Sequence, residues 1–223
     1  QTLMFSATLS REIETLTKQF QKSPKLIEVG RRSNPAETVT QLLYECPGAL
    51  KQVMLHQLLK DETMNMVLVF ARTKHGADRI CRKLSAENIH CAAIHANRSQ
   101  AQRQRALQAF KNGEIRVLVA TDIASRGIDV DGISHVINFD FPDQLEDYVH
   151  RIGRTGRALA KGTAITFITK ENLGDLRRLE KIIGKHLHCG KLPGFDYSQQ
   201  APARVPEDFI RERDPRAGAH RSE

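Results

Sequence analysis

The sequence contains no tryptophan, and aromatic residues make up only 5% of its 223 residues. Proteins that hold single-stranded nucleic acid by stacking its bases on aromatic side chains need more of them, so that mode of recognition is disfavoured. The sequence also has no apolar run long enough to cross a bilayer and no secretory leader pattern. We therefore expect no membrane partner and a cytoplasmic location.

Cysteine is scarce as well, with four residues in the whole chain. Cys46, Cys81, Cys91 and Cys189 form no CxxC pair and have no metal-binding spacing with histidine. The sequence therefore predicts reduced, packed thiols and no metal site.

Acidic residues are outnumbered, because 34 Lys and Arg stand against 26 Asp and Glu, giving a formal net charge of +8. This excess favours polyanionic partners, although many basic proteins bind none. The basic residues are spread along the chain, which favours a compact phosphate-binding face over a disordered basic arm. Since aromatic residues are few, a nucleic acid would be held mainly by its backbone.

Segments with the apolar pattern of buried strands alternate with segments that have helical spacing. This alternation predicts an α/β fold, with a parallel sheet flanked by helices on both faces and right-handed crossovers. The predicted strands are 64–70, 91–94, 115–120, 134–138 and 163–168, and the predicted helices are 74–84, 99–111, a short one ending near 151, and 173–183.

The two ends of the chain differ from this core. Residues 1–30 have the pattern strand, helix and strand, with strands at 1–5 and 25–29, and residues 31–38 have the composition of a linker. The main domain is predicted over 39–189. Residues 190–223 are rich in proline, glycine and charge, and predict a disordered tail.

The most informative segment is residues 150–157, with the sequence HRIGRTGR, called the arginine turn below. Gly153 and Gly156 permit backbone angles closed to other residues, so Arg154 and Arg157 would project from a tight turn. A guanidinium is always charged, and its planar fork suits phosphate oxygens. A merely solvated basic face needs no glycines. The pattern therefore favours an arginine finger.

Four further motifs precede the arginine turn and lie at the ends of predicted elements. They are SAT at 6–8, VFART at 69–73, SQAQR at 99–103 and TDIASRGID at 121–129. Each alone is a weak signal, but five in this order are strong. From residue 1 to about residue 195, the sequence resembles the carboxyl-terminal half of a DEAD-box RNA helicase of the bacterial RhlE-type branch.

This resemblance implies a motor of two RecA-like lobes with ATP and RNA bound in the cleft between them. The phosphate loop, GxxxxGK[ST], and the Asp-Glu-Ala-Asp motif of the first lobe do not occur in the sequence. We therefore expect a fragment of a longer protein, with residues 1–30 as the end of the first lobe. The missing lobe would act in cis and carry the Mg²⁺ ligands, and the protein would be monomeric.

The resemblance also implies roles for individual residues near ATP. Arg154 and Arg157 would reach the γ-phosphate, and Gly127 and Asp129 would lie against the ribose. His150 and Arg151 would tie the arginine turn to the SAT motif of the first lobe. In that motif, Ser6 and Thr8 would couple the two lobes. A plain structural ion pair is an equally open interpretation of Arg151.

For RNA, the resemblance implies that Thr73, Arg103 and Thr121 grip the phosphates and 2′-hydroxyls of a bent strand, independently of base sequence. One position departs from the family pattern. Ala96 stands where a glycine usually follows the histidine, which corresponds here to His95. The added methyl group puts RNA contact through that loop in doubt.

Three functions follow from these observations. The first is one half of an ATP-dependent RNA helicase that unwinds short duplexes. The second is a non-catalytic RecA-like module that binds RNA or protein. The third is a DNA-directed relative, which is disfavoured because those families usually begin the arginine motif with glutamine, whereas this chain has His150 and Arg151.

Overall fold

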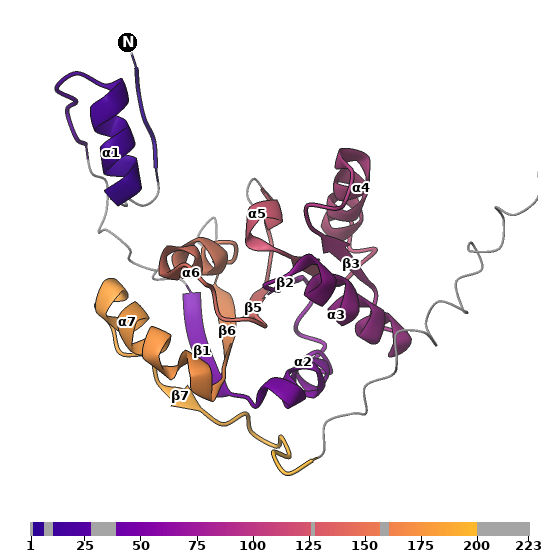
Figure 1. Ribbon diagram of the computed structural model, residues 1–223. Coiled ribbons are helices and arrows are strands. Elements are labelled where there is room, and N and C mark those ends of the chain that lie inside the picture. The colour runs from indigo at the N-terminus through magenta and orange to yellow at the C-terminus, as the bar shows by residue number, and fades with distance from the viewer. Residues whose placement is uncertain (1, 7–10, 28–38, 126–127, 157–160, 200–223) are drawn as a thin grey trace, which may run out of the picture.

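The central feature is a seven-stranded, entirely parallel sheet with the order β3-β4-β2-β5-β6-β1-β7 (Figure 1). The computed structural model describes residues 2–6, 11–27, 39–125, 128–156 and 161–199. The parallel α/β sheet predicted from the sequence is confirmed. In chain order the strands are β1 (Val39–Glu45), β2 (Val67–Phe70), β3 (Cys91–Ile94), β4 (Val117–Ala120), β5 (His135–Asn138), β6 (Gly162–Ile168) and β7 (Cys189–Gly190).

Helices cover both faces of this sheet. On one face, α2 and α3 contribute Leu55 and Ile80 to a buried cluster. On the other face, α4, α6 and α7 contribute Phe110, Tyr148 and Leu179 to a second cluster. No helix among the described residues is long and apolar enough to cross a membrane. The helices are α1 (Arg11–Phe20), α2 (Lys51–Leu58), α3 (Lys74–Ala86), α4 (Gln100–Lys111), α5 (Asp122–Ser125), α6 (Leu145–Ile152) and α7 (Leu173–Ile183), with short 3₁₀ turns at Gly48–Leu50 and Lys170–Asn172.

The middle of the sheet is the most deeply buried part of the fold. All side chains of β2 and β4 are buried, and their sequences, VLVF and VLVA, are continuously apolar. A strand covered by helices on both faces needs apolar side chains on both faces, which explains why these two strands lack polar alternation. This rigid centre fixes the positions of the loops that follow β2 and β4.

Local side-chain chemistry sets where the helices begin and end. Thr73 precedes α3, and its hydroxyl accepts a hydrogen bond from the backbone N–H of Gly76 at 3.0 Å. Ser99 and Gln102 form a reciprocal capping box at the start of α4. At the other end of α7, Gly184 adopts a left-handed conformation with φ of 65°.

The two strands predicted within residues 1–30 are wrong for the residues that can be compared. Residues 2–6 and 24–27 are not in strands, although α1 forms where a helix was predicted. Phe5 is 91% exposed, and Phe20 and Ile27 are also largely exposed. In Figure 1 this segment lies apart from the sheet. A strand is stable only when it pairs with a neighbour, and these segments have none in the described chain.

Ordered packing continues past residue 189, where the sequence placed the end of the main domain. Gly190 belongs to β7, and Phe195 is buried in the same cluster as α2 and α3. The Phe195 and Tyr197 rings meet edge to face at 4.9 Å, and the Tyr197 hydroxyl accepts from the Leu192 backbone N–H at 2.7 Å. The rest of the predicted tail, 200–223, lies outside the described residues.

The prediction of reduced thiols is wrong for two of the four cysteines. Cys81 of α3 and Cys91 of β3 form a disulfide with their Cα atoms 5.6 Å apart. The prediction failed because it compared spacings along the sequence, whereas the packing of α3 against β3 brings these two residues together. Cys46 and Cys189 are free, and burial raises the pKa of each thiol to about 11.

We expect the disulfide to be detectable by thiol titration of the denatured, non-reduced chain, which should show two reactive thiols and four after reduction. Replacing Cys81 by serine should lower the free energy of unfolding by about 2–3 kcal/mol, because the crosslink restricts the unfolded chain. The matched Cys46→Ser variant should keep the crosslink. Four reactive thiols before reduction would contradict the assignment.

Candidate functional site

The sheet brings several of the predicted site residues together at the carboxyl-terminal edge, the edge where its strands end. Because β2, β4 and β5 are parallel neighbours, their carboxyl ends face the same way. Thr121 directly follows β4, while Thr73 and Asp140 lie a few residues beyond β2 and β5. Open parallel sheets bind ligands beyond the carboxyl ends of their strands. This edge, together with the end of α6, is the candidate site.

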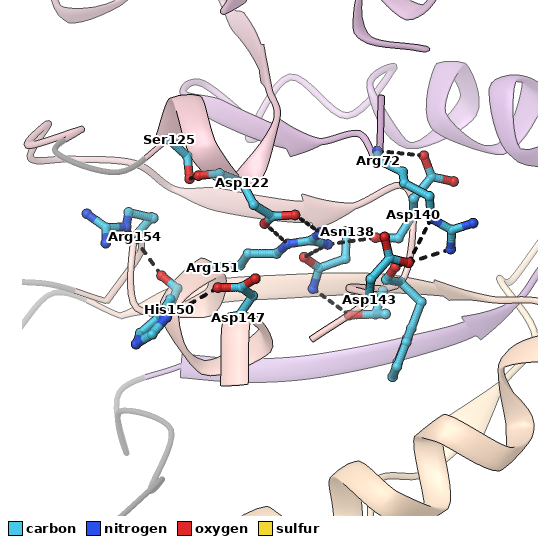
Figure 2. A network of polar contacts seen from close by, with 12 residues as sticks. Arg72, Asp122, Ser125, Asn138, Asp140, Asp143, Asp147, His150, Arg151 and Arg154 are labelled. Atoms are coloured by element: carbon cyan, nitrogen blue, oxygen red, sulfur yellow. Dashed lines mark hydrogen bonds and ion pairs between the residues drawn. The ribbon is translucent and has the colours of Figure 1, made fainter. Parts of the chain in front are cut away.

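Arg151 lies at the centre of the polar network at this edge (Figure 2). Its side chain is 2% exposed and makes a two-pronged ion pair with Asp122, with Nε to Oδ1 at 2.6 Å and Nη2 to Oδ2 at 2.7 Å. Its Nη1 donates to the Asp140 carbonyl at 2.6 Å and to Asn138 Oδ1 at 3.3 Å. Within this lobe Arg151 therefore makes a structural ion pair, and its predicted link to the first lobe stays a prediction.

The surroundings of Arg151 explain how a full charge is held in the interior. Its guanidinium lies 4.9 Å from the centre of the Phe70 ring, at the end of β2. Asn138 is fully buried, and its amide donates to the Thr166 hydroxyl at 2.9 Å while its oxygen faces Arg151. A buried charge is tolerated only when it is paired and hydrogen-bonded, and both conditions are met here.

A second ion pair fixes the loop after β5. Lys51 Nζ lies 2.8 Å from Asp140 Oδ1, and the backbone N–H of Arg72 donates to Asp140 Oδ2 at 3.0 Å. Burial alone would raise the pKa of Asp140, but the attraction of Lys51 and these hydrogen bonds outweigh it and lower the pKa below the ordinary value. Arg72 also pairs with Asp143, at 3.1 Å.

The arginine turn begins in the last turn of α6, and its two glycines have different backbone conformations. Gly156 has φ of 70°, as predicted for a tight turn, whereas Gly153 has an ordinary φ of −69°. A Cβ atom at Gly153 would lie 3.2 Å from the Val149 carbonyl oxygen, so a larger residue would crowd the end of α6. Thr155 is buried, and its hydroxyl reaches the carbonyls of Ile133 and Ser134.

Arg154 donates hydrogen bonds to the backbone carbonyls of Ile128 and His150. Its Nη1 donates to Ile128 at 2.9 Å and its Nε donates to His150 at 3.3 Å. Its side chain is half-buried, as is His150, whose Nδ1 lies 3.5 Å from Asp147 Oδ1. Figure 2 shows Arg154 pointing away from the Arg151 network, so the two arginines of the motif occupy separate environments.

The residues predicted to contact RNA come from three elements. Thr73 is exposed, but its hydroxyl also caps α3. Arg103 of α4 is half-buried, its Nη2 donates to the Ala124 carbonyl at 3.1 Å, and its buried Nε has no partner among the described residues. Thr121 is half-buried at the start of α5. The contact between Arg103 and Ala124 therefore joins α4 to the element that follows Thr121.

The remaining predicted residues divide into two groups. Asp129 and Ser6 are exposed. Thr8, Gly127 and Arg157 lie outside the described residues. Sequence reasoning assigned no role to Asp122 or Lys51, because an ion-pair partner distant in sequence leaves no local pattern.

In the described part of the chain, no three His, Cys, Asp or Glu side chains are grouped so that they could hold a metal ion. The guanidinium of Arg154 offers donors of the kind that bind phosphate oxygens, and Asp129 offers a carboxylate that can accept from a hydroxyl.

We expect Asp122→Asn to destabilise the fold strongly, because it leaves the buried charge of Arg151 without its carboxylate. The free energy of unfolding should fall by about 3–5 kcal/mol in urea titrations. Asp131→Asn is the matched control, because Asp131 is exposed, and it should change the value by about 0.5 kcal/mol at most. Equal unfolding midpoints for the two variants would contradict a structural role for the pair.

The lowered pKa of Asp140 predicts a pH-dependent contribution to stability. A carboxyl group whose pKa is lower in the folded state stabilises the fold above its unfolded pKa, and this stability is lost as the pH falls through the folded pKa. Asp140→Asn should therefore be less stable than the unaltered chain at pH values near 6, and the difference should shrink at pH values near 3. A difference that stays constant with pH would contradict the ion pair with Lys51.

Comparison with known proteins identifies the family. Residues 50–159 match the family described as the helicase conserved C-terminal domain. Among curated proteins, the ATP-dependent RNA helicase RhlB of Pseudomonas syringae is 40% identical over 193 residues, which are 86% of this chain and 49% of the relative. The DEAD-box ATP-dependent RNA helicase CshA of Geobacillus kaustophilus is 37% identical over 92% of this chain and 44% of the relative. The chain thus spans about half the length of these relatives.

Solved structures give the same result and confirm the RecA-like fold. Escherichia coli DEAD-box protein SrmB, bound to the regulator of ribonuclease activity A, matches with a TM-score of 0.66 and 31% identity over 73% of this chain and 96% of that chain. Dbp5 of Saccharomyces cerevisiae, bound to RNA and ADP BeF3, matches with a TM-score of 0.76 and 29% identity over 84% of this chain and 50% of that chain. This chain therefore belongs to the DEAD-box helicase family and carries its C-terminal RecA-like lobe.

Proposed function

We propose that this chain is the C-terminal part of a cytoplasmic, monomeric ATP-dependent RNA helicase that couples ATP hydrolysis to local unwinding of RNA duplexes. The observation that carries the proposal is the arginine turn. In it, Arg151 forms a buried ion pair, while Arg154 lies in a separate environment. The names of the relatives RhlB and CshA support this activity class. The RhlE-type branch is part of the proposal, on the motifs alone.

The proposed role of the arginine turn is to complete an ATP site across two lobes. ATP supplies a γ-phosphate on which negative charge develops during transfer, with Mg²⁺ held by the first lobe. Arg154 and Arg157 would stabilise that charge, and Gly127 and Asp129 would lie against the ribose. Placing the arginines on the second lobe would make hydrolysis depend on closure of the cleft.

Coupling between the lobes is assigned to the remaining polar residues of the motifs. Because the donors of Arg151 are taken up within this lobe, we assign its share of the coupling to positioning of the turn. His150 would face the first lobe, where Ser6 and Thr8 belong to the SAT motif. Contacts among these side chains would make the arrangement of both lobes depend on whether the γ-phosphate is present.

RNA would be held along the same sheet edge by Thr73, Arg103 and Thr121. Threonine hydroxyls and a guanidinium suit phosphates and 2′-hydroxyls, so binding should be independent of base sequence and sensitive to salt. The buried Nε of Arg103, without a partner in the described chain, fits a residue that rearranges on binding. Ala96 is exposed and leaves the backbone less freedom than the glycine usual at this position.

The alternative is a non-catalytic RecA-like module that binds RNA or protein. It would be favoured if the longer protein also lacked the GxxxxGK[ST] phosphate loop, which these 223 residues do not contain. It is disfavoured by the arginine turn, which a simple binding module does not need.

We expect the longer protein, with its first lobe present, to hydrolyse ATP when single-stranded RNA is added, and this chain alone to be silent. Arg154→Ala in that protein should lower the turnover number by about 10³–10⁵. Arg177→Ala is the matched control, because Arg177 is exposed on α7, and it should leave the rate unchanged.

The two proposed functions predict different results in this assay. A folded two-lobe protein that binds RNA yet never hydrolyses ATP would establish the binding module. Turnover that survives in Arg154→Ala would remove the arginine-finger role while leaving the helicase assignment standing.

A further inference from the structure

A groove of about 1050 Å³ runs along β3, the outer strand at the opposite side of the sheet from β7. Its floor is β3, which pairs only with β4 among the described strands. Its walls are α3 and α4, which lie on opposite faces of the sheet. The groove contains neither the arginine turn nor Thr73, Arg103 or Thr121, so it is distinct from the site described above.

The floor of this groove presents unpaired backbone groups. The carbonyls of His90 and Ile94 accept hydrogen bonds from the β4 side. Successive residues of a strand direct their backbone groups to alternate sides, so the N–H and C=O of Cys91 and Ala93 face the groove. The side chains of residues 91–93 are Cys, Ala and Ala, and they are too small to cover this edge. The disulfide between Cys91 and Cys81 fixes α3 beside the floor.

The walls of the groove are basic. Arg79 and Arg82 lie on one face of α3 and are exposed, and Arg98 precedes α4 on the other side. The single carboxylate that lines the groove, Asp78, accepts from Arg98 Nη2 at 2.6 Å and lies 2.9 Å from Nε2 of the buried His95. Its negative charge is therefore taken up locally, and no carboxylate in the described chain pairs with Arg79 or Arg82.

We propose that this groove binds an extended acidic peptide of a partner protein, which adds a strand to β3 and places its carboxylates against Arg79 and Arg82. Addition of a strand uses the open backbone groups of Cys91 and Ala93, and the arginines give the preference for acidic residues. RNA fits the observations less well, because a nucleic acid cannot continue the ladder of β3 and no aromatic side chain lines the groove. The inference is independent of the proposed helicase activity.

The test begins with a phage-displayed library of random peptides of roughly ten residues, panned on the full 223-residue chain. Counter-selection uses the double variant R79E/R82E, whose substitutions lie on an exposed helix face, with its fold checked by circular dichroism. We expect the enriched peptides to be rich in Asp and Glu. In fluorescence anisotropy titrations, the double variant should bind them at least about tenfold more weakly at low salt.

Two matched controls separate charge from strand pairing. Lys83→Glu reverses an exposed charge on α3 outside the groove and should change affinity by about twofold at most. Ala93→Pro removes one outward N–H at an edge position where proline is tolerated, and should weaken binding about fivefold, whereas Ala93→Ser should not. Bound peptide should also slow amide hydrogen exchange at Cys91 and Ala93.

Four results would overturn the proposal. Enriched peptides without excess acidic residues, or peptides that bind R79E/R82E equally well, would remove the charge argument. Binding of labelled oligouridine that is lost in R79E/R82E, with no competition from acidic peptide, would assign the groove to RNA. A library that yields no acidic peptide would leave Arg79 and Arg82 as charges that only guard an edge strand against aggregation.

Discussion

The buried ion pair between Arg151 and Asp122 is the interaction on which the site depends. A guanidinium in the interior must have its charge and its donors satisfied, and here α5, β5 and the loop after β5 all supply acceptors. One side chain therefore joins the last turn of α6 to three other segments. Because breaking any of these bonds would leave polar groups stranded in the interior, the segments are held in one arrangement. The arginine turn begins in the last turn of α6, so the contacts of Arg151 also fix where the turn lies.

This arrangement separates the roles of two arginines that are three residues apart in sequence. Arg151 lies within α6 and points into the core, whereas Arg154 lies beyond the helix end and is held by backbone carbonyls. In the proposed ATP site, Arg151 would fix the position of the arginine turn, and Arg154 would contact phosphate oxygens.

The sequence predicted the parts of the fold whose signals are local. Helix α3, strand β3 and helix α7 lie close to their predicted bounds, because apolar periodicity and capping residues act over a few positions. The strands expected at 1–5 and 25–29 fail because strand formation depends on a neighbour that no local pattern supplies. The ion pairs of Arg151 with Asp122 and of Lys51 with Asp140 join residues 29 and 89 positions apart, so only the strand order could reveal them. The disulfide between Cys81 and Cys91 was missed for the same reason, since it follows from packing.

The edge groove and the proposed RNA surface share two helices, which gives the fold a physical route between them. Thr73 caps the start of α3, and the arginines of the groove lie farther along that helix. Arg103 lies on α4, next to Gln102, which lines the groove. A strand added to β3 would contact both helices and restrict their movement relative to the sheet. Since coupling between two sites requires an element that both sites bias, α3 and α4 are the elements through which a bound peptide would act on RNA contacts. The arginine turn lies at the end of α6, which contacts β5 and α7, so the route through α3 and α4 does not include it.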